Sequence, residues 1–374
     1  MRDSPRLSSV RATRPAPVPL SLHPVLVCPF LEDAESFLRE AVGNRRPVLC
    51  TETRLLPVLN RAITGLERMF PGLARVCIRG GERNKTRRQK ERLEDALFAE
   101  GLDRQGVVLA LGGGVVMDLV GFAAGTFMRG VPFINLPTTL LGMVDASVGG
   151  KVAVNTPAGK NLVGLFHPPA AVCAVLSTLS TLPMAEIRSG LVECLKHGLI
   201  ADEDHFEAAG SAQPGRMARD PSAFSGFVER SIRIKGAVVD RDPEERTGER
   251  NLLNAGHTVG HALERLSGYR LRHGDAVAAG LCWEAALSVA QGYAAPPLLV
   301  RVQAAVRRLG LDPMRDEWPD RDILEAARSD KKNAASQVRY IPLGDVGRPA
   351  LPSPYLAAIG PGDLRKARAL LGRR

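Results

Sequence analysis

The sequence has few features that would place the protein outside the cytoplasm or in a membrane. It contains no CxxC pair, and its six cysteines are scattered along the chain: Cys28, Cys50, Cys77, Cys173, Cys194 and Cys282. Scattered cysteines are typical of reduced cytosolic thiols and argue against a disulfide framework. No apolar run is long enough to span a bilayer, and residues 1–20 lack the apolar core of a secretory signal. We therefore expect a cytoplasmic protein without a membrane partner.

Lysine and aromatic residues are also scarce. Lysine and arginine together number 50, but only nine are lysines, and aromatic residues make up 5% of the chain. The formal net charge is +10, yet no basic block is interleaved with aromatic residues, so no nucleic-acid partner is predicted. In a chain that uses arginine by default, a lysine can mark a site that needs a compact ammonium group. Seven lysines fall in the motifs described below: Lys85, Lys151, Lys160, Lys196, Lys235, Lys331 and Lys332.

The length of 374 residues and the apolar content of 45% predict two domains with ample buried core. Between residues 21 and 180, short β-branched strands alternate with helical patterns, which is typical of a doubly wound α/β domain. The expected strands are residues 24–30, 47–50, 76–78, 107–111 and 131–136. Residues 181–374 have a helical pattern. Residues 1–20, rich in Ser, Pro and Arg, are expected to form a loose tail.

A glycine-rich turn follows the central expected strand. Residues 107–118, VVLALGGGVVMD, combine an apolar strand, three glycines and the start of a helical pattern. Glycines let the backbone approach a ligand, and a helix N-terminus offers free N–H groups and a positive dipole end to a phosphate. The segment does not match GxGxxG, so an ordinary tight turn between a strand and a helix is the alternative.

Two more glycine-flanked segments follow. Residues 137–151, PTTLLGMVDASVGGK, contain four polar residues of interest: Thr138, Thr139, Asp145 and Lys151. Residues 158–169, AGKNLVGLFHPP, are expected to place Lys160 and Asn161 in a second glycine-flanked loop. Three potential anion-binding segments so close together are harder to explain by turns alone than a single one.

The helical part begins with a charged pair in an apolar helix. Residues 182–186 carry the signals of a helix start, an early proline and an acid in the first turn. Glu193 and Lys196 are three residues apart within LVECLKHGLI, so they share a helix face. A surface ion pair is the ordinary explanation of this spacing. The apolar surroundings instead favour buried charges, which need partners.

Histidines recur in residues 250–264, RNLLNAGHTVGHALE. His257 and His261 are four residues apart on an expected helix, a spacing that can place both on one metal ion. His273 follows, just before another helix. A lone buried histidine is usually structural, but three histidines together with Glu193 favour a metal site. Spacing alone names His257 and His261 as the ligands.

Five segments resemble the 3-dehydroquinate synthase family of sugar phosphate cyclases. They are LGGGVVMDLVGF, TFMRGVPFINLPTTLLGMVDASVGGK, GKNLVGLFHPP, LVECLKHGLI and LLNAGHTVGHALE. The similarity runs in order from about residue 48 to residue 340, whereas the N-terminal 45 residues and the C-terminal tail match poorly. The resemblance implies an N-terminal NAD-binding α/β domain, a C-terminal all-helical metal-binding domain and an active site in the cleft between them.

The resemblance also implies the residues that bind the metal and the cofactor. A divalent metal, Zn²⁺ or Co²⁺, would be held by Glu193, His257 and His273, which makes His261 a neighbour of the metal and the substrate. NAD would lie over the glycine turn. Its implied binding residues are Glu52, Glu82, Lys85, Gly113, Gly114, Val115, Asp118, Thr138, Thr139, Lys160, Thr181 and Leu182.

The implied substrate is a sugar phosphate, 3-deoxy-D-arabino-heptulosonate 7-phosphate, which the family converts to 3-dehydroquinate and phosphate in the shikimate pathway. NAD would take a hydride from an alcohol and return it after phosphate has left, so that the cofactor is not consumed. The residues implied to contact the substrate are Asp145, Lys151, Asn161, Lys196, Lys235, Arg250, Asn254, His261, Lys331 and Lys332. In this family an arginine equivalent to Arg129 reaches the substrate of the neighbouring subunit, which implies a homodimer.

Four of the implied cations, Lys151, Lys196, Lys235 and Arg250, would converge on one phosphate and one carboxylate. We expect that they repel one another in the empty site. Each charge-assisted contact with the substrate would contribute roughly 1.5–3 kcal/mol.

Three other functions account for parts of the sequence. Another sugar phosphate cyclase, such as 2-deoxy-scyllo-inosose synthase, would share most of these motifs. An iron-type alcohol or glycerol dehydrogenase would share the fold and the glycine turn, but it leaves the lysines and Arg250 unexplained. A non-catalytic basic binding protein leaves Glu193 and the histidines unexplained.

Overall fold

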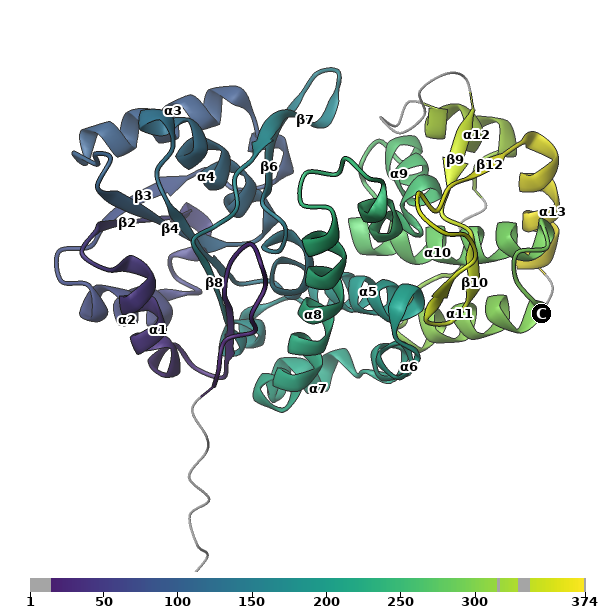
Figure 1. Cartoon of the computed structure of the whole chain (residues 1–374), viewed down its shortest axis with the longest axis horizontal. Coiled ribbons are helices and arrows are strands. Elements are labelled where there is room, and N and C mark those ends of the chain that lie inside the picture. Colours follow the sequence, from purple (N-terminus) through teal and green to yellow (C-terminus); the bar gives the residue numbers. More distant parts are fainter. Residues whose placement is uncertain (1–14, 315–316, 329–336, 373–374) are drawn as a thin grey trace, which may run out of the picture.

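The computed structural model describes residues 15–314, 317–328 and 337–372. Two parts lie next to each other along the long axis of the molecule, a sheet layered between helices and a bundle of helices (Figure 1). Within the described residues, no helix combines the length and the apolar character that a membrane crossing requires.

The N-terminal part is built on a parallel six-stranded sheet. Its strand order is β1-β8-β5-β4-β2-β3, and all of its pairings are parallel. The carboxyl ends of parallel strands meet at one edge, where open α/β sheets bind their ligands. In spatial order the strands are β1 (Val25–Cys28), β8 (Ala171–Val175), β5 (Phe133–Pro137), β4 (Gly106–Gly112), β2 (Arg46–Glu52) and β3 (Ala74–Ile78).

Helices cover both faces of this sheet. Along β4, Val108 belongs to the apolar cluster on one face and Leu109 to the cluster on the other. A strand buried on both faces is typical of a doubly wound sheet, so this expectation is confirmed. The covering helices are α1 (Glu35–Val42) and α2 (Asn60–Met69) on the Leu109 face, and α3 (Arg87–Ala99) and α4 (Gly114–Thr126) on the Val108 face.

An antiparallel hairpin, β6 (Lys151–Thr156) and β7 (Gly159–Phe166), projects from this part. Lys160 and Asn161 lie within β7, so the loop expected around them is wrong. Residues 159–166 pair with β6, in which Val152 and Val154 are buried while the residues on either side are more exposed. This alternation is the periodicity of a strand, and the glycines had concealed it.

Residues 15–20 were expected in a loose tail, but they pack against the molecule. Val18 is buried and exchanges two backbone hydrogen bonds with Val25, with N–O distances of 2.6 and 3.2 Å. Leu20 packs so closely on Gly236 that a Cβ there would lie 2.4 Å from its side chain. The remainder of the expected tail, residues 1–14, lies outside the described residues.

The C-terminal part is helical, as expected, but it also contains two small antiparallel sheets that an all-helical domain would lack. One pairs β9 (Val338–Tyr340) with β12 (Ala357–Ile359), and the other pairs β10 (Leu343–Asp345) with β11 (Arg348–Pro349). The helices are α5 (Met184–Ala201), α6 (Glu203–Ser211), α7 (Pro214–Arg219), α8 (Ser225–Arg241), α9 (His257–Leu266), α10 (His273–Ala290), α11 (Pro296–Arg308), α12 (Asp320–Arg328) and α13 (Pro361–Leu371).

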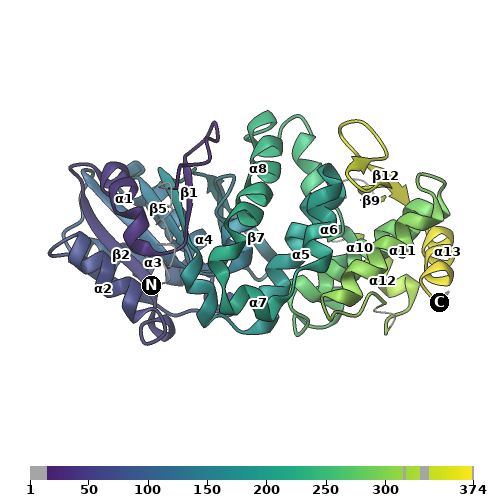
Figure 2. The same cartoon turned by 90° about the horizontal axis from the view of Figure 1, so that it is seen from below.

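One apolar core extends from the edge of the sheet into the helices. Val27 of β1 and Val172 of β8 belong to the same cluster as Leu191 of α5 and Trp283 of α10. Helices α5 and α8 therefore stand at the junction of the two parts (Figure 2). Side chains on these helices are placed to act together with residues from the sheet.

Candidate active site

Helix α5 buries three polar side chains close together. The exposed fraction is 0% for Glu193, 2% for Lys196 and 0% for His197. The ammonium group of Lys196 pairs with the carboxylate of Glu193, so the explanation as a surface ion pair is wrong. Burial alone would raise the pKa of Glu193, but the charges of Lys196 and the neighbouring His257 hold that pKa well below its ordinary value.

Three potential metal ligands from three helices meet at Glu193. Its Oε1 lies 3.6 Å from Nε2 of His257, the first residue of α9, and 3.3 Å from Nε2 of His273, the first residue of α10. The three donor atoms lie within 4.8 Å of one another. Within the described residues, this buried Oε1 has no hydrogen-bond partner. One carboxylate and two imidazoles are a ligand set that suits Zn²⁺, and the unpartnered oxygen fits a bound cation.

Both imidazoles also have a contact at Nδ1, the ring nitrogen that does not face Glu193. Nδ1–H of His257 donates to the carbonyl oxygen of Ala255 at 3.1 Å, and Nδ1 of His273 lies 3.7 Å from Oε1 of Glu264. Contacts of this kind orient a histidine so that Nε2 faces a metal. Burial lowers the pKa of His257 well below its ordinary value. Burial also lowers the pKa of His273, but its contacts with Glu193 and Glu264 outweigh burial and raise that pKa to about 10.

His261 lies beside this group but points elsewhere. Its ring centre is 5.2 Å from that of His257, and the two rings are nearly perpendicular. Among the described residues, His261 shares a group of potential ligands with Glu264 and His273, but not with His257. The i,i+4 spacing therefore does not identify the ligand pair, because Nε2 of His257 faces Glu193.

A second buried ion pair adjoins the first. Nζ of Lys235, on α8, lies 2.6 Å from Oδ1 of Asp145 and donates to the carbonyl oxygen of the same residue at 2.5 Å. Burial alone would raise the pKa of Asp145, but Lys235 and Lys196 hold it well below its ordinary value. Burial lowers the pKa of Lys235, and Asp145 opposes this effect.

Lys151 and Arg250 lie within electrostatic reach of Asp145 but have other contact partners. Nζ of Lys151 lies 2.6 Å from Oε2 of Glu245, and Arg250 donates to the carbonyl oxygen of Gly149 at 3.3 Å. Both side chains are close enough for the charge of Asp145 to oppose the lowering of their pKa values by burial. All four expected cations therefore lie within electrostatic reach of Asp145, although only Lys235 contacts it. The cations do repel one another in the empty site, as expected: beyond the effect of burial, Arg250 lowers the pKa of Lys151, and Lys196 and Arg250 lower that of Lys235. Carboxylates of the chain itself, Glu245 beside Lys151 and Asp145 beside Lys235, partly offset this repulsion.

The other residues expected at the substrate are more dispersed. Asn254 donates to the carbonyl oxygen of Arg250 at 3.5 Å. Asn161 lies beside cofactor candidates, because Lys85 donates to its Oδ1 at 2.5 Å. Arg129 is exposed at the end of a short helical turn with a φ of 69°. Two expected substrate contacts lie outside the described residues: Lys331 and Lys332.

The glycine turn lies at the carboxyl edge of the sheet, between β4 and α4. A Cβ on Gly112 would lie 2.5 Å from Cγ2 of Val116, so only glycine fits the end of the strand. Helix α4 begins at Gly114, with Val115 next, and no side chain caps it. Two threonines line the neighbouring turn: Thr138 donates its N–H to the carbonyl oxygen of Gly112 at 2.9 Å, and Thr139 follows it. An uncapped helix start beside a close backbone approach suits a phosphate of a dinucleotide.

A second set of expected cofactor residues lies next to this turn. Buried Lys85 pairs with Asp118 of α4. Burial raises the pKa of Asp118, and Lys85 opposes the increase. Glu82 accepts a hydrogen bond from Asn155 at 2.7 Å. Glu52, at the end of β2, is buried and pairs with a neighbouring arginine.

Three remaining cofactor candidates lie toward the helical part. Thr181 and Leu182 lie shortly before α5, separated from it by Pro183, and the hydroxyl of Thr181 donates to the carbonyl oxygen of Thr178. Lys160 extends from β7 to the helical part, where Nζ lies 3.5 Å from Oε1 of Glu264 and 4.5 Å from the centre of the Tyr269 ring. The hairpin thus reaches a carboxylate that itself contacts His273.

Sequence reasoning missed two carboxylates at this site. Glu264 could have been found, because it lies seven residues after His257 and three after His261, on the same helix face. Glu245 has no sequence signal, since it lies 94 residues from its partner Lys151 in a loop after α8.

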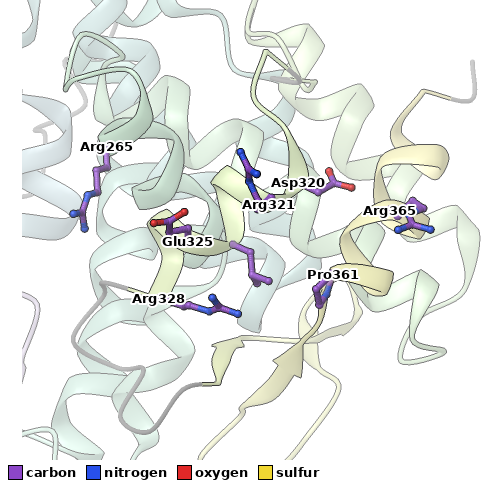
Figure 3. A pocket seen from close by; sticks show the side chains of 8 residues that line it. Arg265, Asp320, Arg321, Glu325, Arg328, Pro361 and Arg365 are labelled. Carbon is purple, nitrogen blue, oxygen red and sulfur yellow. The ribbon is translucent and has the colours of Figure 1, made fainter.

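A separate hollow of about 910 Å³ lies at the far end of the helical part (Figure 3). Its lining comes from the end of α9, from α12 and from α13, and includes Arg265, Arg321, Arg328 and Arg365. It contains none of the residues singled out from the sequence. The candidate active site is therefore the junction of the two parts and not this arginine-lined surface.

Comparisons with known proteins agree with this arrangement. The family model for the N-terminal part of 3-dehydroquinate synthase matches residues 75–189, and the model for its C-terminal part matches residues 190–333. The 3-dehydroquinate synthase of Halorhodospira halophila is 43% identical over 79% of this chain and 84% of its own length. That of Xanthomonas campestris pv. campestris is 40% identical over 92% of this chain and 94% of its own length.

Solved structures share the same architecture. The 2-epi-5-epi-valiolone synthase of Streptomyces hygroscopicus, solved with NAD⁺ and Zn²⁺ bound, superposes with a TM-score of 0.82 over 98% of this chain and 99% of that chain. Its sequence identity of 24% supports the fold alone. The two family models cover most of the chain, and the two relatives match 79% and 92% of it. This protein therefore belongs to the 3-dehydroquinate synthase family.

Proposed function

We propose that the protein converts 3-deoxy-D-arabino-heptulosonate 7-phosphate to 3-dehydroquinate and phosphate. The observation that carries this proposal is the set of four cations within electrostatic reach of Asp145, directly beside the potential metal ligands on α5, α9 and α10. A substrate with a phosphate and a carboxylate needs several cations next to the reacting carbons. A simple alcohol dehydrogenase does not need this cluster.

The metal would be held by Glu193, His257 and His273. The buried, unpartnered oxygen of Glu193 and the two oriented imidazoles support this assignment. A bound divalent cation supplies a Lewis acid that polarises an alcohol or carbonyl oxygen. Lys196 would remain beside Glu193 and keep that carboxylate ionised.

NAD would lie across the glycine turn, with its phosphates at the start of α4. NAD supplies a reversible hydride acceptor, which this reaction regenerates. Thr138 and Thr139 border the turn, and Lys85 with Asp118 would face the ribose side. The buried carboxylate of Glu52 would accept hydrogen bonds from the adenosine ribose, which favours NAD over a 2′-phosphorylated cofactor.

The four cations would bind the anionic groups of the substrate. Lys151 and Arg250 join the sheet part to the helical part, so they can hold a phosphate between the two. Binding of the substrate would then replace Glu245 as the partner of Lys151. Asp145, which holds Lys235 and lies near Lys196, would keep the two ammonium groups charged and oriented.

We also propose a cytoplasmic homodimer in which Arg129 contacts the phosphate in the partner's site. Its exposure and left-handed backbone support a role outside its own subunit. Mixing inactive Arg129→Ala protein with inactive His261→Ala protein should form hybrid dimers with one intact site, and part of the activity should return. No recovery after verified subunit exchange would contradict this role.

The deciding experiment is to incubate the purified protein with NAD, Zn²⁺ and the heptulosonate phosphate. We expect stoichiometric release of phosphate and 3-dehydroquinate, with no net NADH. Accumulation of NADH in proportion to product would identify a dehydrogenase instead. Turnover of glucose 6-phosphate, but not of the heptulosonate phosphate, would identify a different cyclase. Chelation should abolish the activity, and Zn²⁺ or Co²⁺ should restore it.

A further inference from the structure

A buried glutamate of α10 accepts hydrogen bonds from the backbone at the start of α9. Glu284 is fully buried, and its carboxylate accepts three backbone hydrogen bonds. The donors are the N–H groups of Gly256 at 2.7 Å, Thr258 at 3.0 Å and Val259 at 3.3 Å. These three residues enclose His257 in the sequence. The first turn of α9, which carries a potential metal ligand, is therefore bound to α10 through Glu284.

The start of α9 depends on this carboxylate because it cannot cap itself. An N-terminal N–H group of a helix usually bonds to a serine, threonine or aspartate side chain at the preceding position. Gly256 occupies that position with a φ of +77°, and a Cβ there would lie 2.7 Å from the Leu281 side chain. A Cβ on Gly280 would lie 1.9 Å from the carbonyl oxygen of Gly256. The two helices approach too closely for a capping side chain at position 256. Glu284 instead accepts the hydrogen bonds that such a side chain would accept.

The same helix, α10, also carries the second imidazole. His273 begins α10, and Glu284 follows it about three turns later. The ring of His257 is fixed by its own backbone, since its Nδ1–H donates to the carbonyl oxygen of Ala255 at 3.1 Å. Any rotation of the first turn of α9 would therefore move Nε2 of His257 relative to Nε2 of His273.

We propose that Glu284 is a positioning residue for the metal site: by holding the first turn of α9, it sets where His257 meets Glu193 and His273. This inference rests on the metal assignment in the proposed function. Glu284 does not touch the metal or the substrate in this arrangement. Its carboxylate acts through the backbone, and its negative charge lies at the positive end of the α9 dipole.

The test compares Glu284→Gln with the wild type in a zinc titration of the metal-free protein against a competing chelator. Glutamine keeps the shape but lacks the charge, and its amide nitrogen cannot accept a hydrogen bond. We expect the Kd for Zn²⁺ to rise by roughly 10–100-fold, as for other groups that orient metal-binding histidines. The absorption bands of the Co²⁺-loaded variant should also shift, because they report ligand geometry. Glu284→Asp keeps the charge but has a shorter side chain, so it should weaken zinc binding as well. This second variant tests the inference if Glu284→Gln does not fold.

Ser288→Ala is the matched control. Ser288 lies one turn further along α10, is equally buried, and accepts a hydrogen bond from the N–H of Leu343 at 2.9 Å. Its loss should lower the Tm without changing the zinc affinity or the Co²⁺ spectrum. A Glu284→Gln protein that binds zinc within twofold of wild type would overturn the inference, even with a lower Tm. A wild-type protein that binds no zinc would overturn the metal assignment itself, and the inference with it.

Discussion

Helices α4 and α5 are both largely buried and both border the candidate active site, but they contribute different kinds of atoms. Helix α4 starts at an uncapped glycine turn and offers backbone N–H groups there, with the side chain of Asp118 one turn further along. Helix α5 offers side chains, because it buries Glu193 and Lys196 as an ion pair. A site made of backbone places no uncompensated charge in the empty protein. A site made of buried charges makes the stability of the fold depend on the same residues as the chemistry.

The largest expected effect is that of Lys196→Met on the metal-free protein. The change leaves the carboxylate of Glu193 buried without its cation, and breaking a buried pair in this way costs about 3–5 kcal/mol. Urea unfolding of the chelator-treated protein should show this loss, and Zn²⁺ should restore part of it.

Lys90→Met is the control for this prediction, because Lys90 pairs with Glu94 at 2.6 Å on α3, where both side chains are partly exposed. A partly exposed pair of this kind contributes about 0.2–1 kcal/mol. Equal losses in the two variants would contradict the dependence of stability on the buried charges of α5.

Lys235→Met should have a smaller effect on stability. Its partner Asp145 has a side chain that is 25% exposed, so water can partly replace the lost ammonium group. We expect a loss of about 1–3 kcal/mol and a decrease of at least tenfold in kcat/KM. Thermal unfolding without ligand and steady-state kinetics measure the two effects. A variant that loses activity but has an unchanged Tm would show that Asp145 does not need this partner in the empty protein.

The free energy of unfolding should depend on pH through Asp242, a carboxylate separate from Glu193 and Asp145. Asp242 accepts backbone hydrogen bonds from Arg246 at 2.7 Å, Thr247 at 3.1 Å and Arg250 at 3.3 Å. Burial alone would raise the pKa of Asp242, but these N–H groups outweigh burial and lower it from 3.8 to about 2. A lowered pKa in the folded state contributes stability above pH 4, and that contribution is lost as the pH falls toward 2. In Asp242→Asn the same pH range should show a flatter profile, whereas an identical slope would exclude Asp242 as the cause.

Gly114→Ala should have the smallest effect on stability and a clear effect on the cofactor. A Cβ at Gly114 would lie 3.5 Å from Cβ of Ala146, an ordinary contact, and alanine is a better helix former than glycine. The Tm should not fall. NAD binding, measured by calorimetry, should weaken at least tenfold because the added methyl group narrows the approach to the helix start. Unchanged NAD affinity would contradict the placement of the phosphates there.

Parts of the site were accessible from the sequence because they rest on local patterns. The strand, glycine turn and helix at residues 107–118 follow from a β-branched run and three glycines, and the structure places them as expected. The burial of Glu193 and Lys196 also follows from sequence, since the helix around them is apolar. Glu264 was accessible in the same way but was not identified.

Other features could not be predicted because they depend on residues far apart in the chain. The packing of the sheet against the helices brings Lys151 to Glu245 and Lys235 to Asp145. The packing of α10 against α9 brings Glu284 to the start of α9. The hairpin at Lys160 was also missed, because its glycines suggested a turn where pairing with β6 makes a strand.

The amino-acid sequence alone determined the fold class, the position of the glycine turn and the residue types available for metal and anion binding. These depend on hydrophobic periodicity and backbone freedom, which are local properties. Spacing alone named the wrong pair of histidines, and the family resemblance implied the other set. Only the tertiary structure decided which carboxylate neutralises each cation. The physical reason is that a buried charge takes whatever partner the packing brings within a few ångströms, and separation along the chain does not limit that choice.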